Sequence, residues 1–231
     1  MSGNRSPKRS WFSAWLPSAG RPAAPARVPA LEMPPQPAAA LDLVAKEQLA
    51  VAQGLPLYLD AIREESRSQA TLSAAARHQG TTAALNEIAR LTSDLATRVE
   101  PGAMTERVSQ LAERNELLGL LGDSIRELAD TMEQAMTSGA LATLTADLAE
   151  GLHVVLLSAI DVMETPDETN LEILHHLTMD RGQLMESLRR SLLRGEHTLT
   201  VEDHQALFTS TRLFERVILL LRQLQSNLAR P

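Results

Sequence analysis

The sequence of 231 residues contains no cysteine, few aromatic residues and no long apolar run. The absence of cysteine excludes disulfides, thiolate metal ligands and cysteine nucleophiles. Aromatic residues make up only 3% of the chain, so the core has to consist of Leu, Ala, Val, Ile and Met. The longest apolar runs, VVLLSAI and VILLL, are far shorter than the roughly 20 residues of a membrane-spanning helix. With no export signal recognisable around WFSAWL, these absences predict a cytoplasmic protein with an aliphatic core.

Proline and positive charge are concentrated at the N-terminus. Eight of the 12 prolines lie in residues 1–37, where they remove amide donors and disfavour helix. Residues 1–30 carry five basic and no acidic side chains, whereas the remainder carries 17 basic and 29 acidic ones. We therefore predict a disordered basic tail over residues 1–37. Trp11, Phe12 and Trp15 could give this tail a weak contact with a membrane surface, although a solvated linker is the favoured interpretation.

Three helices are expected in residues 38–137, because apolar residues there recur every three or four positions. The first should run to Ile62 with a kink at Pro56. The second should cover residues 69–99 and stop at Pro101. The third has the most regular apolar seam, which predicts packing along another helix; its members are Val108, Leu111, Asn115, Leu118, Gly122, Ile125, Ala129, Met132 and Met136.

Three more helices are expected in residues 138–231, after a break at Ser138 and Gly139. Thr165 matches the N-cap of a capping box that starts the fifth helix, and Gly195 should follow its end. Thr200 should cap the sixth helix. The apolar stripe of this last helix consists of Leu207, Phe214, Val217, Ile218, Leu221, Leu224 and Leu228.

Short connections require each group of three helices to fold back on itself. The predicted fold is therefore all-α, with a first three-helix bundle over residues 38–137 and a second over residues 138–231, both antiparallel.

The most distinctive sequence segment of the chain is residues 178–224. There the run DRGQLMESLRR (residues 180–190) is followed by Leu-Thr at 199–200 and Leu-Phe-Glu-Arg at 213–216. These segments resemble the PhoU-like cytoplasmic domain at the C-terminus of bacterial sodium/phosphate cotransporters. The resemblance weakens back to Ala38 and is absent from the tail. It implies two consecutive three-helix bundles, and either a detached domain that acts in trans or a piece of a split transporter.

The resemblance also implies positions for metal sites. Members of the PhoU family typically bind clusters of iron or zinc through an acidic residue followed four positions later by aspartate, once per bundle. Carboxylates at this spacing share one helical face. The matching positions here hold Gly119 with Asp123 and Glu215 with Leu219, so each pair lacks one carboxylate. We therefore expect degraded sites that hold no metal, and no other cofactor.

Two further groups of charged residues are candidates for binding. One is an acidic row with a single imidazole at intervals of four residues, which could hold a divalent cation; it comprises Glu164, Glu168, Glu172, His176 and Asp180. Because this row lies opposite the leucine face, a solvated exterior is the favoured interpretation. The other group, Arg189, Arg190 and Arg194, could contact phosphate, but its expected role is to stabilise the end of a helix.

No catalytic motif is present, since Gly-x-Ser-x-Gly, His-Glu-x-x-His, Walker and Gly-x-Gly-x-x-Gly sequences are all missing. The acidic body disfavours nucleic-acid binding. We expect a non-enzymatic regulatory or interaction domain for phosphate handling, without catalytic residues, that engages a membrane phosphate transporter or its membrane portion at the inner membrane. The alternatives are a scaffold that self-associates into homo-oligomers, unrelated to phosphate, and a sensor that binds metal or phosphate.

Overall fold

The computed structural model describes residues 33–63, 72–137, 141–179, 185–186, 190 and 199–230. Every regular element within these ranges is a helix, which confirms the predicted all-α class. The elements are α1 (Pro37–Gly54), the 3₁₀ helix η2 (Pro56–Leu59), α2 (Ala74–Ala96), α3 (Ala103–Ala135), α4 (Ala142–Glu164), α5 (Glu168–Thr178) and α7 (Val201–Leu228). Most of the predicted tail, the break at Ser138 and Gly139, and Gly195 lie outside the described residues.

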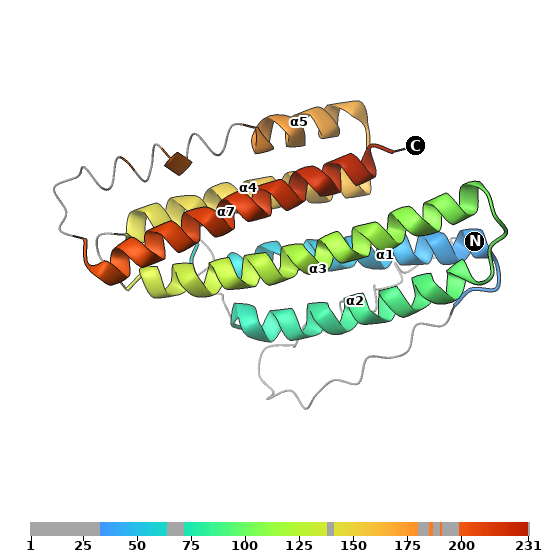
Figure 1. Cartoon of the computed structure of the whole chain (residues 1–231), viewed down its shortest axis with the longest axis horizontal. Helices are drawn as coiled ribbons and strands as arrows, with labels where there is room; N and C mark the ends of the chain where they lie inside the picture. Colours follow the sequence, from blue (N-terminus) through green and yellow to red (C-terminus); the bar gives the residue numbers. More distant parts are fainter. Residues whose placement is uncertain are drawn as a thin grey trace, which may run out of the picture.

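The two longest helices, α3 and α7, lie side by side at the centre and run in opposite directions (Figure 1). Helices α1 and α2 pack beside α3, and α4 and α5 pack beside α7. The contact between α3 and α7 is the most extensive of the helix pairs. Buried side chains from all six described α-helices belong to one continuous hydrophobic cluster. The two groups of helices therefore share a core, and the boundary between two bundles at residue 137 remains a prediction.

The apolar seam of α3 is confirmed. All of its predicted members are buried except Met136, which is half-buried at the end of the helix. The polar member, Asn115, donates a hydrogen bond from Nδ2 to the carbonyl oxygen of Leu85 on α2 at 3.0 Å. On the side of α1, Gln48 Nε2 donates to the carbonyl oxygen of Leu111 at 2.7 Å. These bonds fix the register of α3 against its two neighbours.

The expected kink at Pro56 is wrong, because the proline ends the helix. Helix α1 stops at Gly54, and η2 begins at Pro56. Proline has no amide hydrogen and its ring collides with the carbonyl four residues earlier, so an α-helix cannot pass through it undisturbed. The Leu55 amide already donates to the carbonyl oxygen of Ala52, a tighter bond typical of a 3₁₀ turn.

The start of the fifth helix also differs from the prediction. Thr165 is the C-cap of α4, and its amide donates to the carbonyl oxygen of Asp161 at 2.9 Å. The N-cap of α5 is Asp167, whose carboxylate accepts a hydrogen bond from the amide of Asn170 at 2.8 Å. Both residue types suit an N-cap, and the sequence alone placed the cap two residues too early.

The predicted cap of the last helix is confirmed as a full capping box. Thr200 Oγ1 accepts a hydrogen bond from the amide of Asp203 at 3.1 Å, and Asp203 Oδ2 accepts one from the amide of Thr200 at 2.9 Å. All seven residues of the predicted apolar stripe on α7 are buried. Helix α7 therefore begins directly after the N-cap that the sequence predicts.

The two caps give a direct test. We expect Asp167→Ala and Thr200→Ala each to lower the free energy of unfolding by about 1 kcal/mol, because each leaves helix amides without an acceptor. Thr165→Ala is the matched control and should change it by less, since the Thr165 side chain is exposed and does not cap α5. Urea unfolding followed by circular dichroism measures all three. A larger loss for Thr165→Ala than for Asp167→Ala would contradict the cap assignment.

Candidate functional site

The positions that match the family's metal motif lie on α3 and α7. Asp123 is exposed, and its Oδ1 lies 3.2 Å from Nε2 of His78 on α2. Leu219 is one of the exposed apolar residues of α7, one turn beyond the half-buried Glu215. Within the described ranges, no three or more His, Asp or Glu side chains are grouped so as to hold a metal ion. The structure thus offers no alternative metal centre there.

The acidic row along the end of α4 and α5 faces solvent. Glu164, Glu168, Glu172 and His176 are all exposed, as expected of a solvated exterior, whereas Asp180 lies outside the described residues. Glu164 Oε1 accepts a hydrogen bond from Nε2 of Gln53 on α1 at 2.8 Å. This bond links the end of α4 to α1.

Of the three predicted helix-end arginines, only Arg190 is described. Its Nε lies 3.0 Å from Oε1 of Glu186, four residues earlier, and both side chains are exposed. Arg189 and Arg194 lie outside the described residues. An exposed pair at this spacing contributes only a few tenths of a kcal/mol, so nothing at Arg190 indicates an anion site.

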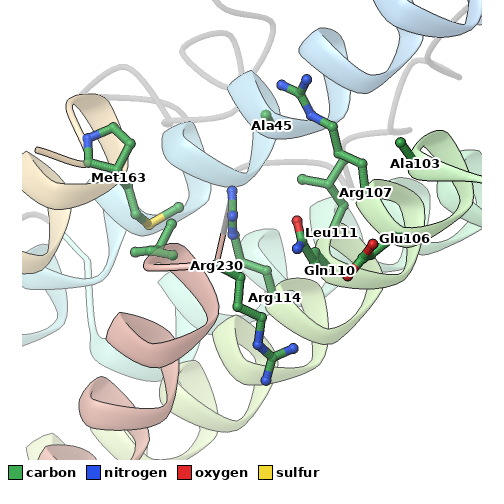
Figure 2. A pocket seen from close by; sticks show the side chains of 11 residues that line it. Ala45, Ala103, Glu106, Arg107, Gln110, Leu111, Arg114, Met163 and Arg230 are labelled. Carbon is green, nitrogen blue, oxygen red and sulfur yellow. The ribbon is translucent and has the colours of Figure 1, made fainter.

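A cavity of about 450 Å³ opens where α1, α3, the end of α4 and the end of α7 meet (Figure 2). Its volume falls in the range of small-ligand pockets, roughly 300–1,000 Å³. It is lined by Ala45, Ala103, Glu106, Arg107, Gln110, Leu111, Arg114, Met163, Pro166, Leu228 and Arg230. Both predicted halves of the chain contribute to its walls.

Three arginines distinguish this cavity. Arg107 and Arg114 lie seven residues apart on α3, a spacing that returns to the same face after two turns. Arg230 follows the end of α7. One acidic side chain, Glu106, lines the cavity with them. Arg107 and Arg230 are at least half exposed, whereas Arg114 is half-buried and so is the least screened by solvent.

Arg114 is held in place by the end of α7. Its Nε donates a hydrogen bond to Oδ1 of Asn227 at 3.1 Å. Asn227 is only 1% exposed, and its Nδ2 donates to the carbonyl oxygen of Gln110 at 3.1 Å and to Oε2 of Glu113 at 3.2 Å. The guanidinium of Arg114 is thereby fixed between α3 and α7.

The charge of Arg114 is poorly compensated. Burial lowers the pKa of its guanidinium, and the positive charge of Arg107 lowers it further. Among the described residues no carboxylate forms an ion pair with Arg114. Arg114 is half-buried, and a nearby anion would stabilise its charge.

The other two arginines of the cavity form ion pairs of unequal strength. Arg230 forms two hydrogen bonds with Glu113, at 2.6 and 3.3 Å. That contact lowers the pKa of the Glu113 carboxyl below its ordinary value. Arg107 lies 3.8 Å from Asp42, and both side chains are more than half exposed, so this pair is weak. Arg107 is therefore available to a ligand at little cost.

The cavity offers charged binding groups. Among its described lining residues there is no serine, threonine, histidine, lysine or tyrosine, and the one carboxylate is that of Glu106. Guanidinium groups bind carboxylate and phosphate through paired N–H donors. The arrangement is thus suited to holding an anionic group.

The cavity was not predicted from the sequence. The available signal was the pair Arg107 and Arg114 on one side of a helix with a regular apolar seam. The third arginine comes from the far end of the chain, and only the packing of α7 along α3 brings it near. Arg190, the described member of the arginine group that the sequence did single out, is not among the residues that line the cavity.

No protein-family model matches the chain, and no curated protein or solved structure gives a significant match. The resemblance of residues 178–224 to the PhoU-like domain stays a prediction from the sequence. None of the described helices combines the length and the hydrophobicity that a bilayer span requires.

Proposed function

We propose that this chain is a non-enzymatic, PhoU-like regulatory or interaction domain associated with sodium-dependent phosphate transport and phosphate homeostasis. The resemblance of residues 178–224 supports the family, and the all-helical fold is compatible with two three-helix bundles. The observation that carries the proposal is the arginine-lined cavity between α1, α3, α4 and α7, which offers charged binding groups.

In the proposed mechanism, the shared aliphatic core keeps the helices in a fixed arrangement. The outer faces, such as the exposed acidic row from Glu164 to His176, contact the membrane portion of a phosphate transporter at the cytoplasmic side. The cavity spans both halves, so its occupancy changes how firmly they are held together. Binding at the cavity and contact with the transporter are thus linked through one fold.

The test is a pair of measurements in the native host. Deleting the chain should change sodium-dependent uptake of radiolabelled phosphate by at least about twofold. A tagged copy should restore uptake and co-purify with the phosphate transporter's membrane protein, identified by mass spectrometry. Phe214→Ala, which we expect to destabilise the fold, is the negative control and should restore less phosphate uptake than the unmutated chain. Unchanged uptake together with stable homo-oligomers and no transporter partner would favour the self-associating scaffold instead.

A further inference from the structure

The cavity at the junction of α1, α3, α4 and α7 has a charge pattern that selects its ligand. Three arginines and one carboxylate, Glu106, line the cavity. Outside its wall, Glu113 pairs with Arg230, and Asp42 lies 3.8 Å from Arg107. Among the described residues, Arg114 is thus the lining arginine without a carboxylate partner. From this geometry we infer that the cavity binds a small oxyanion of the phosphate type, either inorganic phosphate or the phosphate group of a small phosphomonoester.

The position of Arg114 is the first argument. Its Nε already donates to Asn227, which fixes the plane of the guanidinium. The terminal nitrogens have no carboxylate partner in the described part of the chain. A planar group fixed in this way offers paired N–H donors at little entropic cost, which is the geometry that arginine uses for phosphate and carboxylate.

The proximity of Arg107 is the second argument. The two guanidinium groups are close enough that the charge of Arg107 lowers the pKa of Arg114. This repulsion is unfavourable, and an anion bound near both arginines would be attracted to each of them. A divalent cation would instead add to the repulsion, so the cavity is not a metal site.

The size and walls of the cavity narrow the ligand class. A volume of about 450 Å³ exceeds that of a single phosphate ion, so a phosphomonoester with a small organic group also fits. The apolar wall includes Met163, Pro166 and Leu228, against which such an organic group would pack. Large polyanions such as nucleic acids are excluded by the enclosing helices and by the net charge of −7.

A ligand bound in the cavity would contact two segments that are distant in the sequence. Arg107 and Arg114 belong to α3, whereas Leu228 and Arg230 belong to the end of α7. A ligand that contacts both sides stabilises the folded chain, because it binds the assembled cavity and not the separated helices. The inference rests on the proposed function only in treating the cavity as a binding site.

The test uses the full chain and inorganic phosphate. Titration calorimetry at constant ionic strength should show saturable binding at one site, and phosphate should raise the unfolding temperature more than chloride does. Glycerol phosphate is the second probe: tighter binding than inorganic phosphate would assign the site to a phosphomonoester. Absence of saturable binding of both probes at millimolar concentration would overturn the inference.

Substitutions of the lining arginines test whether phosphate binds in this cavity. Arg114→Met keeps the bulk and removes the charge, so it should weaken phosphate binding at least about tenfold, the loss expected for a charge-assisted contact. Arg107→Gln should weaken it about threefold or more and, being at an exposed residue, should not disturb folding. Arg90→Gln, an exposed arginine of α2 outside the cavity, is the control of equal charge change and should bind as the parent does. Equal binding by the parent and both cavity variants would refute the site.

Three outcomes distinguish this inference from a lipid-headgroup site and from the proposed function. Capture of the chain by phosphatidic acid vesicles that is lost in Arg114→Met, without binding of soluble phosphate, would assign the cavity to a lipid headgroup and overturn the inference. Phosphate binding without any effect of the chain on phosphate uptake would support the inference and reject the proposed function. An effect on uptake without phosphate binding would do the opposite.

Discussion

Replacing Phe214 by alanine should lower the free energy of unfolding by about 3–5 kcal/mol, the usual cost of removing a buried phenylalanine ring. Phe214 is 3% exposed on α7 and belongs to the continuous core that all six described α-helices share. A loss of this size is a large fraction of the stability of an ordinary domain. Because the core is shared, we expect the destabilisation to reach α1 and α2 as well as the helices beside α7.

Tyr58 makes this spread measurable. It is the only tyrosine of the chain, lies in η2 and is 2% exposed, so it reports on the first group of helices. With Trp11 and Trp15 replaced by phenylalanine, its fluorescence can be followed during urea unfolding alongside circular dichroism. Coincident curves, both shifted by Phe214→Ala, would indicate one cooperative unit.

The control for this prediction is Phe208→Ala on the same helix. Phe208 is 48% exposed, so its removal should cost about 0.5 kcal/mol or less. A Tyr58 curve that stays in place while the circular dichroism curve of Phe214→Ala shifts would contradict a cooperative core. That result would instead favour two bundles that unfold independently, as the division at residue 137 would predict.

Local signals in the sequence predicted most of the helices. The seam of α3 and the stripe of α7 could be recognised because apolar residues at steps of three and four define a buried face whatever the neighbours are. The cap at Thr200 was recognisable because Thr200 and Asp203 satisfy each other's backbone amides within four residues. Helix faces and caps depend on a few consecutive residues, so they could be predicted without knowing the tertiary structure.

The errors arose where two local solutions compete. Thr165 and Asp167 are both good caps, and the choice depends on whether α4 continues through Thr165. The effect of Pro56 depends on whether the next turn can tighten into a 3₁₀ helix. The arginine cavity could not be predicted for a different reason: it needs residues 107–114 and Arg230 together, and that proximity is a property of tertiary packing.

The second large effect concerns Glu47 on α1, which is buried although nothing in the sequence marks it as special. It is 3% exposed, and its Oε2 has no hydrogen-bond partner among the described residues. Burial raises the pKa of its carboxyl from 4.5 to about 7, an effect that the nearby charge of Lys46 only partly opposes. At neutral pH and above, the fold therefore has to accommodate a carboxylate in an apolar environment.

The sign of the pH dependence follows from the two pKa values. Between pH 4.5 and 7 the folded chain retains a proton that the unfolded chain has lost, so the contribution of Glu47 to stability falls as the pH rises through this window. Since a tenfold change in proton affinity is worth about 1.4 kcal/mol, the loss is about 3 kcal/mol at most above pH 7.

Glu47→Gln imitates the protonated acid and should remove this loss. We expect the variant to be more stable than the parent by about 1–3 kcal/mol at pH 8 and to differ little from it near pH 4.5. Urea unfolding at a series of pH values measures the difference, with Glu116→Gln, at an exposed position of α3, as the control that should show no such trend. A stability gain that is the same at both pH values would mean that packing, and not the charge of Glu47, accounts for it.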